Sequence, residues 1–169
     1  MSNYTLSNIS DFHSDEMTGN YLVLFGVDKI PPHIGYVQNQ YYYSKSSQGV
    51  KRKFDFNKVI SSINRKGLPT IVIELNGLSL DPDQFFIGSN LSKGESCLNP
   101  IKEMMGRSNE AIKEVKYLFD LLDLLLKEGY IQKVEHLNCE KFISNGSISL
   151  KKYTQEDIDK AILDAKRPC

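Results

Sequence analysis

Apolar residues occur in short continuous runs in the first half of the chain, and these runs predict strands. The runs at 21–26 and 70–75 are rich in aliphatic residues and end at glycine or polar positions, which is typical of buried strands. Two more runs, at 33–37 and 41–47, are aromatic or β-branched and are joined by the polar residues 38–40. This pattern predicts a β-hairpin.

Apolar stripes with helical spacing predict helices between and after these strands. The first helix follows Asp55, which can cap its N-terminus, and ends at Gly67. The last begins at Thr154, with Asp157 three residues on in an acidic variant of the capping box. We therefore expect helices near both 56–66 and 155–166.

The longest stripe predicts a single helix from about Ser108 to Glu128. Its apolar face includes Leu122, Leu125 and Leu126, and a glycine after Glu128 supplies the end. Such a stripe usually packs against a core, and a partner-binding helix is the alternative.

Asn145-Gly146 separates two strand-like runs and predicts a second hairpin. We see no internal repeat or domain boundary. Residues 1–18 are polar and mixed, so we expect a partly ordered N-terminal arm, followed by a single α+β domain over 19–169. The predicted fold class is α+β, with a mostly antiparallel sheet and helices packed against it.

Charge and composition narrow the classes of function. Lys plus Arg and Asp plus Glu both number 21, so the formal net charge is zero, which argues against a nucleic-acid partner bound by general electrostatic attraction.

No run approaches the roughly 20 apolar residues of a membrane span, and the N-terminal residues lack the features of a secretory signal. We expect a cytoplasmic protein. No metal-ligand spacing or cofactor motif is present, and the oligomeric state stays open.

The chain has three cysteines, Cys97, Cys139 and Cys169, without a Cys-x-x-Cys spacing. This pattern suggests neither a disulfide framework nor a zinc site, so a functional thiol would act as a thiolate. Pro100 fits only the first turn of a helix, which places Cys97 at the N-cap or just before it. A helix N-terminus would stabilise a thiolate at Cys97. The alternative is that Cys97 is a small buried thiol with a structural role.

The segment from Gly19 to Ile60 resembles the histidine half of the circularly permuted papain-fold amidases, relatives of the NlpC-type cell-wall peptidases. The matching pieces, in order, are "YLVLFG", "HIGYV", "YYYSKSS", Gly49-Val50 and the helix "DFNKVI". In that family the cysteine lies downstream at a helix N-terminus, as Cys97 does here. The resemblance covers roughly residues 19 to 105 and implies a permuted papain-like fold.

The resemblance implies that Cys97 is the nucleophile and His33 the general base, acting through a thioester intermediate. The family's third catalytic residue comes from the next strand, where this chain offers Tyr43, Ser44 and Lys45. None of them is the usual His, Asn, Gln or Glu. Ser44 could hydrogen-bond an imidazole weakly, so it is the candidate for the third position.

Cys139 is a rival nucleophile. Asn138-Cys139-Glu140, with Phe142 two places on, resembles the cysteine motif of the lecithin retinol acyltransferase family. That cysteine should open a helix, whereas the hairpin at Asn145-Gly146 predicts that Cys139 lies on a strand. We therefore prefer Cys97.

Two functions follow as hypotheses. The first is a cysteine amidase, peptidase or acyltransferase that acts on a peptide, acyl or small-molecule substrate, with the long loop over 76–96 shaping the substrate cleft. The second is a catalytically inactive papain-like domain that serves as a binding or interaction module.

Overall fold

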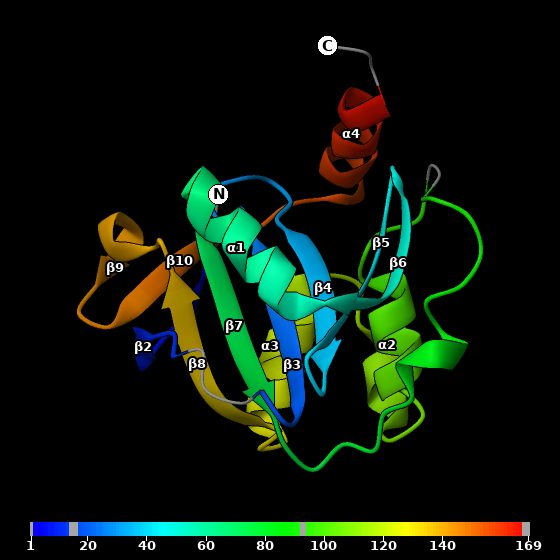
Figure 1. Cartoon of the computed structure of the whole chain (residues 1–169), viewed down its shortest axis with the longest axis horizontal. Helices are drawn as coiled ribbons and strands as arrows, with labels where there is room; N and C mark the ends of the chain where they lie inside the picture. Colours follow the sequence, from blue (N-terminus) through cyan, green and yellow to red (C-terminus); the bar gives the residue numbers. More distant parts are fainter. Residues whose placement is uncertain (1, 14–16, 92–93, 167–169) are drawn as a thin grey trace.

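A seven-stranded sheet forms the centre of the molecule, with helices on both of its faces (Figure 1). The computed structural model describes residues 2–13, 17–91 and 94–166. In spatial order the strands are β2 (Ile9–Asp11), β8 (Ile131–Leu137), β7 (Thr70–Leu75), β3 (Asn20–Phe25), β4 (His33–Gln38), β5 (Tyr41–Ser46) and β6 (Gly49–Asp55). The helices are α1 (Phe56–Lys66), α2 (Asn99–Met105), α3 (Leu118–Lys127) and α4 (Gln155–Lys166).

The strand pairing confirms the predicted α+β class with a mostly antiparallel sheet. Among the described strands of the large sheet, the β2–β8 pair is parallel and every other neighbouring pair is antiparallel. A smaller antiparallel sheet contains β1 (Asn3–Leu6), β10 (Ser147–Lys151) and β9 (Ile143–Ser144), in that order.

The N-terminal segment is more structured than its sequence suggests. Residues 1–18 were expected to form a partly ordered arm, yet β1 pairs with β10 and β2 pairs with β8. Most side chains of these short strands are exposed, and Leu6 is the buried exception. Their polar composition therefore conceals strands whose stability comes from backbone pairing with distant segments.

The first predicted helix is confirmed at both ends. Asp55 accepts a hydrogen bond from the backbone N–H of Asn57 at 2.9 Å, which satisfies a free donor of the first turn of α1. Gly67 adopts a left-handed conformation with φ of 59° and donates its N–H to the last turn. Phe56 and Ile63 form the buried side of the helix.

Both predicted hairpins are confirmed, and their turns have the positive φ angles that suit the twist of paired strands. Asn39 and Gln40 connect β4 to β5 with φ of 49° and 71°. Asn145 and Gly146 connect β9 to β10 with φ of 51° and 70°.

The single helix predicted over 108–128 is wrong. A 3-10 turn over Glu110–Glu114 ends at Val115, whose extended backbone (φ −66°, ψ 140°) interrupts the helical path. Helix α3 then begins anew, with the N–H of Tyr117 donating to the carboxylate of Asp120 at 3.1 Å. Leu126, which the pattern placed on the apolar face, is 59% exposed.

Two apolar clusters fill the space on the two faces of the large sheet. Helix α1 covers the first cluster and lies in front of β7 and β3 in Figure 1, whereas α3 lies behind the sheet. The second cluster contains α2 and α3 together with Leu78, Phe86 and Leu91 from the long loop. This loop therefore packs into the second cluster.

The last predicted helix is also confirmed. The N–H of Thr154 donates to the carboxylate of Asp157 at 2.8 Å at the start of α4. Helix α4 stands at one end of the molecule, away from α1 (Figure 1). None of the helices in the described part of the chain is long and apolar enough to cross a membrane.

Candidate functional site

His33 opens strand β4 and lies on the face of the sheet that α1 covers. Side chains alternate along a strand, so His33 shares this face with Val37, while Ile34 points to the opposite face. The imidazole stacks on Phe25 of the neighbouring strand, with ring centroids 5.7 Å apart. The hydroxyl of Tyr42 lies 3.4 Å from Nε2 of His33, within hydrogen-bond reach.

Gly35 explains how Tyr42 reaches the histidine. A Cβ atom at this position would overlap the ring of Tyr42, because the ring crosses β4 directly over the glycine. Phe25 meets the Tyr42 ring edge-on and Phe56 stacks against it. The glycine two places after His33 is therefore a packing requirement of the Tyr42 ring.

The surroundings of His33 favour the neutral imidazole. Burial lowers the pKa of His33 to about 4, and the positive charge of Lys51 contributes in the same direction. At neutral pH the side chain therefore carries no charge. A neutral imidazole can accept a proton or a hydrogen bond from a group in front of it.

Cys97 lies just before helix α2, as Pro100 predicts. Leu98 is the N-cap residue, and the hydroxyl of Ser96 accepts a hydrogen bond from its N–H at 3.3 Å. The half-buried thiol packs against the cluster on the α2 and α3 face and borders a small pocket with Ile34. Burial raises the pKa of Cys97 to about 11, although hydrogen bonding from the backbone of Ile34 acts in the opposite direction.

Cys97 lies beside the strand that carries His33. The backbone of Ile34, the residue after His33, hydrogen-bonds to the Cys97 sulfur, and Cys97 also acts electrostatically on Tyr42, whose hydroxyl is 3.4 Å from Nε2 of His33. The thiol packs with the cluster on the α2 and α3 face, and the imidazole stacks on Phe25 of the other cluster. No hydrogen bond connects their side chains among the interactions of the described residues. The thiol and the imidazole are thus both neutral in this arrangement.

Ser44, the predicted third residue, is buried, and among the described residues no hydrogen bond joins its hydroxyl to His33. Its hydroxyl interacts with that of Tyr42. The other two positions considered lie elsewhere, since Tyr43 packs in the α2 and α3 cluster and the amine of Lys45 is 3.9 Å from a carboxylate oxygen of Glu95. The sequence did not predict that Tyr42 is a neighbour of His33. A glycine inside the predicted strand, at position 35, could have indicated that a large side chain such as Tyr42 packs over it.

Cys139 is not on a hairpin strand, which corrects the sequence prediction. It precedes a short 3-10 turn over Glu140–Phe142, is fully buried, and donates its thiol to the carbonyl of Thr70 at 3.4 Å. Burial raises the pKa of Cys139 to about 11. These contacts indicate a structural thiol, and Cys169 lies outside the described residues.

His136 has a structural position near Cys139. Its Nδ1 accepts a hydrogen bond from the N–H of Cys139 at 3.3 Å, and its Nε2 lies 2.8 Å from a carboxylate oxygen of Asp11. The pair with Asp11 attaches β2 to β8. This histidine therefore stabilises the edge of the sheet.

A cavity of about 750 Å³ opens beside His33 and is large enough for a small molecule. Its described lining comes from the β3–β4 connection, the β5–β6 hairpin and α1: Phe25, Gly26, Lys29, Pro31, His33, Tyr42, Ser44, Ser46, Ser47, Gln48, Gly49, Val50, Lys51, Val59, Lys66 and Leu68. The loop over 76–96 supplies none of these residues. Ser96 of this loop does line the small pocket that borders Cys97 and Ile34.

No group of three or more His, Cys, Asp or Glu side chains that could hold a metal ion occurs within the described ranges. Comparison of the chain with protein-family models, with curated proteins and with solved structures found no match. The class that the fold defines is a mixed α+β domain with a mostly antiparallel sheet.

Proposed function

We propose that this protein is a ligand-binding domain of permuted papain-like architecture and that its binding site is the cavity beside His33. The order of the elements supports the proposal, because β3, the His-x-Gly strand β4, β5, β6, α1 and β7 all precede Cys97. The cavity combines an aromatic floor with a few polar groups, which is the usual composition of a small-molecule site.

One observation carries the preference for binding over catalysis: among the described residues no hydrogen bond joins the Cys97 thiol to His33, whose Nε2 lies 3.4 Å from the hydroxyl of Tyr42 instead. A cysteine nucleophile needs an imidazole within hydrogen-bond reach, about 2.6–3.2 Å, to take its proton. The raised pKa of Cys97 and the lowered pKa of His33 both oppose a thiolate-imidazolium pair. This agrees with a catalytically silent domain.

The cysteine amidase, peptidase or acyltransferase is the second candidate. It is favoured by the backbone of Ile34, which hydrogen-bonds to the Cys97 sulfur and is adjacent to His33 in sequence. The thiol therefore lies beside the strand that carries the histidine. In this alternative, Cys97 and His33 would meet when a peptide or acyl substrate binds.

The rate at which iodoacetamide labels each cysteine, followed by peptide mass mapping between about pH 5 and pH 9, separates the two candidates. We expect Cys97 to react slowly at neutral pH and at the same rate in His33→Ala. Cys97→Ser identifies the signal of this thiol. Fast labelling of Cys97 well below the ordinary thiol pKa, lost in His33→Ala, would establish the enzyme instead.

A further inference from the structure

Three lysines surround the mouth of the cavity beside His33, and each comes from a different element. Lys29 lies in the connection between β3 and β4, Lys51 lies on the edge strand β6, and Lys66 lies in the last turn of α1. Segments that are far apart in the sequence therefore bring three positive charges to one opening.

Among the residues that the structure describes, no carboxylate forms an ion pair with any of these three lysines. The described lining contains no aspartate or glutamate. Lys51 does contact an aromatic ring, with its amine 5.4 Å from the centroid of Phe54. Cation–π contact leaves the positive charge in place.

The charges also influence the interior of the cavity. The field of Lys51 reaches His33 and contributes to its lowered pKa. Hydroxyl groups border the same cavity on Ser44, Ser46 and Tyr42, and the Ser46 hydroxyl also donates to the carbonyl of Gly49 at 3.4 Å. Like-charged ammonium groups next to hydroxyl donors attract an anion with several acceptor oxygens.

We propose that the cavity binds a small molecule that carries a phosphate monoester and an apolar body. This inference rests on the proposed binding function and names the class of its ligand. A phosphate monoester carries about two negative charges above its second pKa of roughly 6, so it compensates three lysines better than a single carboxylate does. Phe25, Val59 and Leu68 supply an apolar wall for the rest of the ligand.

The test is a titration of the full chain with phenyl phosphate at about pH 7.5, where the probe is mostly a dianion, followed by NMR and by calorimetry. Phenol, which has the same ring without the charge, is the matched neutral probe. We expect phenyl phosphate to shift the resonances of His33 and Tyr42 and to bind more weakly as salt is added. The pKa of His33 should rise on binding, because the anion offsets the field of Lys51.

Substitutions identify the groups responsible. Lys29→Gln, Lys51→Gln and Lys66→Gln should each weaken binding about two- to fivefold, as expected for exposed charge pairs. Lys127→Gln is the matched control, because Lys127 is exposed on α3 on the other side of the sheet. It should leave the affinity unchanged, and thermal melting of each variant shows that it is folded.

Equal binding of phenol and phenyl phosphate at His33 would overturn the phosphate inference and leave the binding function standing. Binding of phenyl phosphate that is indifferent to all three lysine substitutions, or absence of binding, would also overturn it. Failure of the proposed function appears separately, as fast labelling of Cys97 that depends on His33.

Discussion

The hydroxyl of Tyr42 lies 3.4 Å from Nε2 of His33, and the tyrosine ring reaches this position by crossing Gly35. The packing of His33, Gly35 and Tyr42 in the β4–β5 hairpin is therefore interdependent. The histidine that resembles a catalytic base in sequence belongs, in the fold, to an aromatic group with Tyr42 and Phe25.

Gly35→Ala should destabilise the protein by about 1–3 kcal/mol, the usual cost of adding a methyl group to a well-packed site. The new Cβ would overlap the ring of Tyr42 and displace it from His33. Urea unfolding measures the loss. Gly19→Ala is the control, since its Cβ would lie 3.8 Å from the nearest atom, the Cε2 of Tyr21, and it should change stability little. Equal stability of Gly35→Ala and the parent chain would contradict the packing role.

The low pKa of His33 predicts a loss of stability in acid. The pKa of His33 is about 6.5 in the unfolded chain and about 4 in the folded protein. At pH values between the two, the imidazole is protonated in the unfolded chain but stays neutral in the folded protein. The contribution is thus complete above about pH 6.5 and is lost as pH falls to about 4, by up to roughly 3 kcal/mol. The groups that oppose protonation are the charge of Lys51 and the buried surroundings of the ring.

NMR titration of His33 measures its pKa directly, and urea unfolding at several pH values measures the effect on stability. His33→Gln should lose the part of the pH dependence that belongs to this residue, and His13→Gln should keep it. A measured pKa near the ordinary histidine value of about 6.5 would show that water reaches the His33 ring more than its burial indicates.

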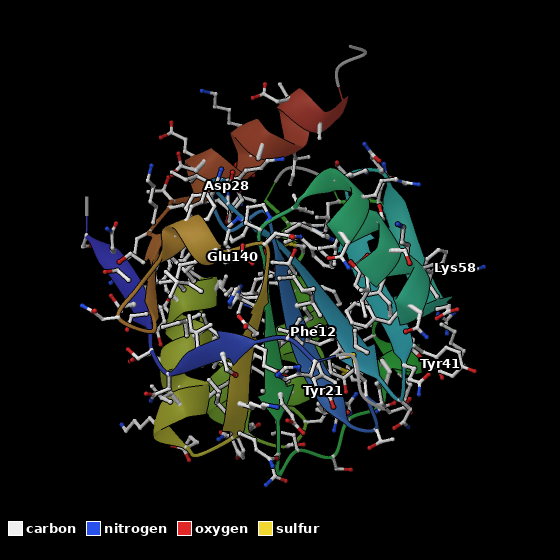
Figure 2. All side chains as sticks on the ribbon, turned by 60° about the vertical axis from the view of Figure 1, so that its left-hand side comes forward. Phe12, Tyr21, Asp28, Tyr41, Lys58 and Glu140 are labelled. Carbon is white, nitrogen blue, oxygen red and sulfur yellow. The ribbon has the colours of Figure 1, made fainter. Side chains whose placement is uncertain are left out.

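The cap of α1 should contribute measurably to stability. Asp55→Ala removes the acceptor for the N–H of Asn57, which costs about 0.5–2 kcal/mol at helix N-caps. Lys58→Ala on the same helix is the control, because this side chain is exposed and extends away from the molecule (Figure 2). Thermal unfolding of the two variants side by side tests the cap, and a similar effect of both would refute it.

Two adjacent leucines of α3 should differ sharply. Leu125 is fully buried, whereas Leu126 is 59% exposed. Leu125→Ala leaves a cavity in the core and should cost about 2–5 kcal/mol. Leu126→Ala should stay within about 0.5 kcal/mol, as surface substitutions usually do. Comparable losses in chemical unfolding would mean that Leu126 is covered in solution, for example by a partner.

Local patterns in the sequence were sufficient for much of the fold. The buried strands β3 and β7, the cap at Asp55, the stop at Gly67 and the turn at Asn145-Gly146 depend on near neighbours in the chain. Period, capping and turn chemistry act over a few residues, so the sequence alone predicts them. The prediction of one long helix was wrong because Val115 has an extended backbone, which its place in the apolar spacing does not indicate.

The tertiary structure alone decided what surrounds each candidate residue. Sheet order and strand register place Tyr42 next to His33, bring the Cys97 sulfur to the backbone of Ile34, and gather Lys29, Lys51 and Lys66 at one cavity. The same long-range pairing turns the polar N-terminal residues into strands β1 and β2. The sequence by itself determined the local elements and the residue types available, because these depend on short-range backbone and side-chain preferences. Which of those residues meet was decided by contacts between distant segments, which exist only once the sheet has formed.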